Sequence, residues 1–164
     1  AGRSVAENMA LPSMRRFARA GWLRRPLMNR TAERVMGDLR LRPLDVTRAI
    51  GLFSGGNQQK AIIGRWLAAE TEVLLLDEPT RGIDVGAKSE IYALIERLAA
   101  EGKAIIVVSS EMPEIIRLSD RLLVMREGRI VATLSRDEIT QENIARHAIP
   151  PRGVVAPDAG KSTS

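Results

Sequence analysis

Residues 73–108 are VLLLDEPTRGIDVGAKSEIYALIERLAAEGKAIIVV, and this stretch decides the fold. Two short apolar runs, at residues 73–76 and 104–108, have the length and composition of strands that are buried on both faces. Residues 86–100 between them place apolar side chains on one side of a helix, with Gly102 as its stop signal. Strand, helix and strand at this spacing predict a βαβ unit with parallel strands and a right-handed crossover.

Outside this stretch the sequence divides into simpler parts. Residues 1–50 are rich in arginine and have helical patterns, including a capping box from Ser4 to Glu7. Residues 121–125 and 129–133 flank Glu127 and Gly128, which predicts a two-stranded hairpin. A further helix is predicted over residues 137–148. We expect three regions: 1–50, an α/β core over 51–149, and a flexible tail over 150–164.

Composition and charge narrow the class of protein. The 164 residues are 45% hydrophobic and 27% charged, as in folded domains, and they include no cysteine, which excludes disulfides and thiolate metal sites. Residues 1–50 hold eleven arginines against four acidic residues, a balance of +7, whereas the whole chain carries +5. This basic region could meet nucleic acid, an acidic protein or a lipid surface, or could form solvated helix faces, and composition leaves these alternatives open.

Two acidic residues, Asp77 and Glu78, directly follow the first apolar run. Ligands of parallel sheets lie at the carboxyl ends of the strands. One carboxylate there can hold Mg²⁺ through its water shell, and a second can orient or deprotonate an attacking water. The alternative is a solvated strand end without chemistry.

Residues 53–60, FSGGNQQK, precede a helical stretch at 61–69. The two glycines allow a ligand to approach the backbone closely, and the following helix offers unpaired N–H groups and its positive end. The Ser54 hydroxyl adds a donor. Together these groups favour a phosphate site, while a glycine turn with a helix N-cap is the alternative.

These motifs together resemble the ABC ATPase family. FSGGNQQK is similar to its signature motif, VLLLDEP to its Walker B motif, and residues 81–84 to its D-loop. The variants GNQQK, DEPTRGIDVGAK and VVSSEMPEI resemble the second ATPase half of the ribose, galactose and xylose type of sugar importer. The resemblance covers residues 3–147. It implies a partial P-loop NTPase fold of the α/β class, with a mostly parallel sheet and flanking helices, in which residues 1–50 are the remainder of the helical subdomain.

The resemblance also implies roles for individual residues. ATP and Mg²⁺ are the expected cofactors. Asp77 would assist the metal and Glu78 would position the hydrolytic water. The signature residues would touch the γ-phosphate of an ATP held by the opposing half, and the D-loop aspartate would couple the two sites. The expected ATP-binding residues are Ser54, Gly55, Gly56, Gln58 and Asp84.

Two positions depart from the wider family. Its switch histidine falls at Ser110, whose hydroxyl cannot become cationic, although the subgroup has Ser here. Ser110 is nevertheless the expected catalytic switch residue beside Glu78. The P-loop pattern GxxxxGK[ST] does not occur, because the GKST at residues 160–163 has Val155 where the first glycine is needed. We therefore expect these 164 residues alone to be inactive as an ATPase.

The resemblance implies an ATP-binding and ATP-hydrolysing subunit that energises carbohydrate import. Its expected partners are a second ABC ATPase half, transmembrane permease subunits and, indirectly, a sugar-binding protein, at the cytoplasmic face of the plasma membrane. The alternative is a catalytically inactive, truncated ABC module that acts as a binding or regulatory partner. No nucleic acid is expected as a partner, because aromatic residues are only 3% of the chain and do not alternate with the arginines.

Overall fold

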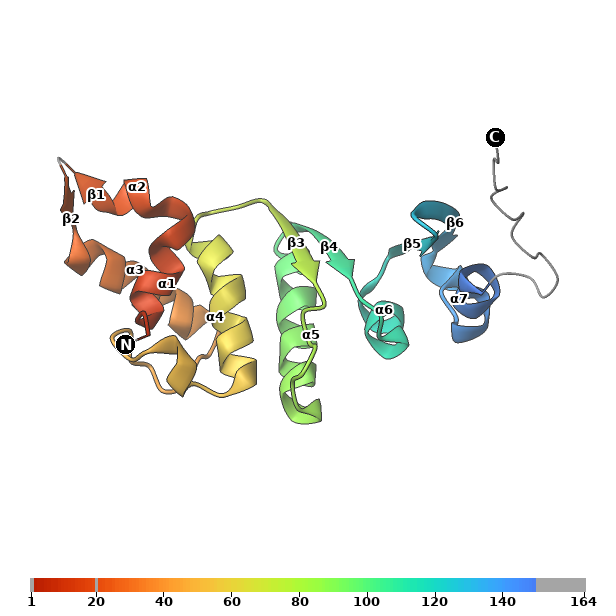
Figure 1. Ribbon diagram of the computed structural model, residues 1–164, viewed down its shortest axis with the longest axis horizontal. Helices are drawn as coiled ribbons and strands as arrows, with labels where there is room; N and C mark the ends of the chain where they lie inside the picture. Colours follow the sequence, from red (N-terminus) through yellow and green to blue (C-terminus); the bar gives the residue numbers. More distant parts are fainter. Residues whose placement is uncertain (1, 20, 150–164) are drawn as a thin grey trace, which may run out of the picture. The chain divides into compact units, whose positions relative to one another are not determined.

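The βαβ unit predicted from the sequence is present in the computed structural model, which describes residues 2–19 and 21–149 (Figure 1). Strands β3 (Val73–Asp77) and β4 (Ala104–Val108) are parallel neighbours, paired from Val73 with Ala104 to Asp77 with Val108. Helix α5 (Val85–Ala100) connects them. At the end of α5 the N–H of Gly102 donates to the carbonyl of Ala99, and the N–H of Lys103 donates to the carbonyl of Leu98. This pair of hydrogen bonds is the Schellman motif, which a glycine at this position favours.

The expectation that both strands are buried on both faces is wrong for the described residues. Leu74 and Leu76 are buried, but Leu75 between them is 73% exposed. Its partner Ile106 and the neighbouring Val108 are also more than half exposed. An unbroken apolar run contains no alternation, so the sequence could not indicate that one face of the pair is covered and the other is open.

A group of helices forms the first part of the chain. These are α1 (Val5–Ala10), α2 (Met14–Phe17), α3 (Arg25–Asp38) and α4 (Gly55–Ala68), with 3-10 turns at Leu11–Ser13 and Ile50–Leu52. Helices α1, α3 and α4 pack on one another around buried side chains such as Met9, Met36 and Ile63. The predicted capping box is confirmed: the Ser4 hydroxyl accepts from the N–H of Glu7, and the Glu7 carboxylate accepts from the N–H of Ser4.

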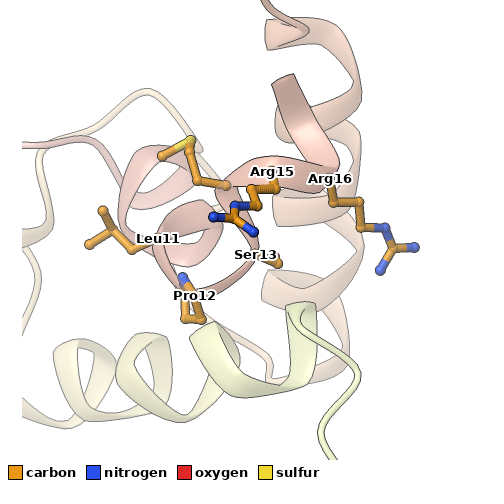
Figure 2. A pocket seen from close by; sticks show the side chains of 6 residues that line it. Leu11, Pro12, Ser13, Arg15 and Arg16 are labelled. Atoms are coloured by element: carbon orange, nitrogen blue, oxygen red, sulfur yellow. The ribbon is translucent and has the colours of Figure 1, made fainter. Parts of the chain in front are cut away.

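A shallow hollow lies on this helical part, over the turn between α1 and α2 (Figure 2). Residues 11–16 line it. The arginine side chains beside it differ in their surroundings: Arg16 forms an ion pair of 2.7 Å with Glu70, whereas Arg15 is exposed and forms no ion pair with any described residue. Two short strands that the sequence did not predict follow at once, β1 (Ala18–Arg19) and β2 (Trp22–Leu23).

The described part of the chain divides into two compact units after residue 114, and helix α6 (Met112–Leu118) spans the division. In the second unit β5 (Arg121–Arg126) and β6 (Arg129–Ser135) form the predicted antiparallel hairpin. Its turn places Glu127 and Gly128 at φ values of 51° and 74°, as a two-residue hairpin turn requires. The described sheets are therefore one parallel pair and two antiparallel pairs.

The helix predicted over residues 137–148 is present only in part. A 3-10 turn at Arg136–Glu138 comes first, and α7 (Gln141–Ala148) begins after Thr140, whose hydroxyl accepts from the N–H of Asn143. This cap interrupts the run because a capping threonine has extended backbone angles. The predicted tail over 150–164 lies outside the described residues, and the boundary at residue 50 stays a prediction.

Across residues 2–19 and 21–149, no helix combines the length and the apolar character that crossing a bilayer requires.

Candidate functional site

The glycine turn at residues 54–56 begins helix α4 with Ser54 as the N-cap residue. No side chain caps the helix: the Ser54 hydroxyl instead accepts a 3.0 Å hydrogen bond from the Asn57 amide, and the Gln58 amide donates to the carbonyl of Phe53 at 2.7 Å. Ser54 and Gly55 are exposed. The start of this 14-residue helix is therefore exposed at Ser54 and Gly55, although Gly56 is buried, and no side chain occupies its positive end, as an anion site requires.

Helices α4 and α5 lie beside one another with their starts at the same end (Figure 1), and they approach closely at Gly56. A Cβ added at Gly56 would lie 2.6 Å from the Cβ of Ala87. Ala87 stands in the first turn of α5, where its N–H donates to the Asp84 carboxylate at 2.9 Å. Asp84 is thus the N-cap of α5, and only a glycine at position 56 lets the two helix starts meet.

A second contact fixes α4 against α5. The Lys60 ammonium lies 2.6 Å from the Glu90 carboxylate, and the lysine side chain is only 9% exposed whereas that of Glu90 is 65% exposed. The lysine of the FSGGNQQK stretch is therefore a structural cation between helices in this fold.

Asp77 and Glu78 stand at the carboxyl end of β3, as predicted, but in different surroundings. Asp77 is exposed and forms no hydrogen bond or ion pair through its side chain with any described residue. Its carboxylate is free to accept from the water shell of a metal ion. Mg²⁺ in phosphate-transfer sites usually has one or two protein carboxylates, so a single free aspartate fits this ion.

Glu78 is held at three points. Its backbone has φ at +46°, a conformation that costs a non-glycine residue about 1–3 kcal/mol. Its N–H donates to the carbonyl of Val108 at 2.8 Å, and its carboxylate accepts from the N–H of Ser110 at 2.9 Å. The strained backbone and the two hydrogen bonds direct this carboxylate toward the end of β4.

Ser110 therefore meets Glu78 through its backbone rather than its side chain. Ser110 is exposed, and the hydroxyl of the neighbouring Ser109 accepts a hydrogen bond from the N–H of Glu111. The segment after β4 thus presents a neutral N–H donor to Glu78, where a histidine would present a side chain that can become cationic.

Glu111 fastens the same segment to α5. Its carboxylate accepts a 2.6 Å hydrogen bond from the Lys88 ammonium. This hydrogen bond is the main cause that raises the pKa of Lys88 above its ordinary value. The contact joins the first turn of α5, next to Asp84, to the residue that follows Ser110.

A buried hydrogen bond lies behind Asp77 and Glu78. The Thr80 hydroxyl donates to the Glu114 carboxylate at 2.9 Å, and both residues are fully buried. The other carboxylate oxygen of Glu114 is buried and has no partner among the described residues. This bond ties the turn after Glu78 to the start of α6.

The predicted site residues therefore form two groups. Glu78 and Ser110 are joined by a hydrogen bond, and Gly56 meets the first turn of α5, which Asp84 caps. No hydrogen bond or ion pair among residues 2–19 and 21–149 joins residues 54–56 to Glu78. Sequence reasoning missed Lys88, Glu111 and Glu114. The one available signal was a glutamate at position 114 beside Pro113 and two isoleucines, since a carboxylate in an apolar run needs a buried partner.

Gly56→Ala is expected to destabilise the first unit by about 1–3 kcal/mol, because the new methyl group would overlap Ala87. Gly55→Ala is the matched control: nothing lies within 4 Å of a Cβ at Gly55, so alanine should be neutral or stabilising there. Thermal unfolding of the variants measures both effects. The double variant, Gly56→Ala with Ala87→Gly, should lose less stability than the two single variants lose together. Additive losses would show that this contact does not control the packing.

Comparison with known proteins agrees with this geometry. The model of the ABC transporter family matches residues 2–81, which include the FSGGNQQK stretch and the residues from Val73 to Pro79. Two curated relatives are the arabinose import ATP-binding protein AraG of Rhizobium meliloti, 51% identical over 150 residues, and the ribose import ATP-binding protein RbsA 2 of Rubrobacter xylanophilus, also 51% identical over 150 residues. The chain belongs to the ABC transporter ATP-binding family.

The matches cover 91% and 92% of this chain but 30% and 29% of the two relatives, so the chain spans less than a third of their length. Solved ABC structures show the same fold. A metal-chelate type ABC transporter in an inward-facing conformation has a TM-score of 0.76 at 20% identity, with 90% of this chain and 59% of that chain covered. The ATP-binding cassette MJ1267 has a TM-score of 0.73 at 21% identity, with 90% and 63% covered. The partial ABC ATPase fold predicted from the sequence is confirmed.

Proposed function

We propose that this chain is part of the ATP-binding subunit of an ABC transporter that imports a sugar, and that it supplies the signature motif, the Walker B motif and the D-loop. The observation that carries the proposal is the uncapped, solvent-facing start of α4, packed at Gly56 against the helix that Asp84 caps. A phosphate at this helix start would have backbone N–H donors and the positive helix end. No contact or distance in the described residues favours the alternative, a purely regulatory module.

At the signature turn, Ser54 and the N–H groups of Gly55 and Gly56 would bind the γ-phosphate of an ATP held by a second ATPase half. The Asn57 amide, which donates to the Ser54 hydroxyl, would orient that hydroxyl. Gln58 braces the turn through the Phe53 carbonyl. Asp84 would couple the two ATP sites, because it caps the helix whose first turn contacts Gly56.

At the end of β3, Asp77 would hold Mg²⁺ through its water shell, and the metal would neutralise phosphate charge. Glu78 would accept the proton of the attacking water, or orient it, while the N–H of Ser110 fixes its carboxylate. The N–H of Ser110 occupies one carboxylate oxygen of Glu78, so the other oxygen remains for the water. Lys88 and Glu111 would hold the Ser110 segment in place.

The relatives are named as import ATP-binding proteins for arabinose and for ribose, which supports sugar import as the function of the whole assembly. We assign a second ATPase half and permease subunits as partners, a sugar-binding protein as an indirect partner, and a peripheral position at the cytoplasmic face of the membrane. Residues 1–50 would be the remainder of the helical subdomain that docks on the permease, residues 51–149 the C-terminal part of the ATPase core and residues 150–164 the tail.

Photolabelling tests the composite ATP site. ATP with a photoreactive group on its γ-phosphate, added with Mg²⁺ to the intact transporter, should label the peptide that contains residues 54–58. Labelling should disappear when excess ATP competes. Absence of label from residues 54–58, whether or not other peptides of this chain are labelled, would contradict the proposed role of the signature turn.

A further inference from the structure

The two short strands after α2 form an exposed hairpin. Ala18 pairs with Leu23 and Arg19 with Trp22, and all four residues are exposed. Phe17 anchors its base: its side chain is 1% exposed, and its carbonyl accepts from the N–H of Arg24 at 2.7 Å. We call residues 18–24, apart from the undescribed residue 20, the tryptophan hairpin.

An aromatic side chain lies open on this hairpin. Trp22 is 81% exposed and its neighbour Leu23 is 38% exposed. The other tryptophan of the chain, Trp66 on α4, is 42% exposed. Indole rings combine a large apolar area with an N–H donor, a combination that favours the boundary between water and lipid.

The charge around Trp22 has one sign. No acidic residue occurs between Glu7 and Glu33, while this interval holds six arginines. Only Arg16 among them forms an ion pair with a described residue, so the other guanidinium groups face solvent unpaired: Arg15, Arg19, Arg24, Arg25 and Arg30. Guanidinium groups bind phosphate oxygens in bidentate geometry.

We propose that the tryptophan hairpin binds an anionic lipid surface, with Trp22 and Leu23 inserted at the level of the headgroups and Arg19, Arg24 and Arg25 on lipid phosphates. An exposed apolar pair between guanidinium groups is the arrangement of an interfacial anchor. The same charges would attract nucleic acid, but a strand of bases needs several stacking surfaces, and the hairpin offers a single aromatic ring. This contact would be additional to permease docking and does not depend on ATP.

Vesicle binding of the 164-residue chain tests the proposal. Phosphatidylcholine vesicles that contain phosphatidylglycerol should sediment the chain, and vesicles of phosphatidylcholine alone should not. In Trp66→Phe, which leaves Trp22 as the one tryptophan, emission should shift to the blue on anionic vesicles. Circular dichroism checks the fold of each variant.

Substitutions locate the contact. Trp22→Ala should weaken partitioning by about tenfold. Changing Arg19, Arg24 and Arg25 together to Gln should weaken it by about 100-fold, at roughly fivefold for each charge. The matched control changes Arg34, Arg40 and Arg42 to Gln, which removes the same charge elsewhere and should have a much smaller effect.

The hairpin variants also distinguish vesicle binding by the hairpin from vesicle binding by the open face of β3 and β4. Binding that survives both hairpin variants, or that is equal on uncharged vesicles, would overturn the proposal and assign the contact to Leu75 and its neighbours. A blue shift with single-stranded RNA and none with anionic vesicles would overturn it in favour of nucleic acid.

Discussion

Gly55→Asp is expected to lower ATP-dependent sugar import by the intact transporter by about 100-fold or more, without loss of folding stability. A carboxylate at this position would stand at the start of α4, where the γ-phosphate is proposed to bind, and would repel it. The fold should tolerate the change, because nothing lies within 4 Å of a Cβ at Gly55. An acidic residue in the first turn should even stabilise the helix by about 0.3–1 kcal/mol.

Because Gly55→Asp should lower transport but raise stability, unfolding would not explain a loss of transport. Uptake of labelled sugar measures transport, and thermal unfolding of the purified protein measures stability. Gly55→Ala is the control, because it adds a side chain without charge and should keep most of the transport. Undiminished import by Gly55→Asp would refute the assignment of residues 54–56 to a phosphate site.

Glu78→Gln is expected to lower phosphate release at the site that contains Glu78 by about 100-fold or more. The glutamine carbonyl can still accept from the N–H of Ser110, so the local structure should persist. What is lost is the group that takes the proton of the attacking water. Nucleotide binding should remain, because Glu78 is not proposed to bind the phosphates of ATP.

Phosphate release in a single turnover measures hydrolysis, and a filter assay measures nucleotide binding. Glu72→Gln is the control, since this exposed residue stands before β3 and has no role in the proposed mechanism. Equal rates for Glu78→Gln and the unchanged protein would mean that the site with Ser110 hydrolyses no ATP, and that Glu78 has a structural role there.

The sequence by itself determined the features whose signals are local. The strands β3 and β4, helix α5 with its glycine stop, the capping box at Ser4 and the turn at Glu127 and Gly128 all follow from short stretches of chain. Backbone preferences and hydrogen bonds between near neighbours decide these elements. The motifs that led to the ABC family are also contiguous, so one sequence sufficed to find them.

Only the tertiary structure decided which distant groups meet. The bonds from Ser110 to Glu78 and from Thr80 to Glu114 join residues 32 and 34 positions apart, and the contact of Gly56 with Ala87 joins two helices. Which face of β3 stays open, and that Trp22 stands on an exposed hairpin, likewise depend on what the rest of the chain covers. Composition and periodicity describe one segment at a time, whereas burial and long-range contacts arise from the packing of segments on one another.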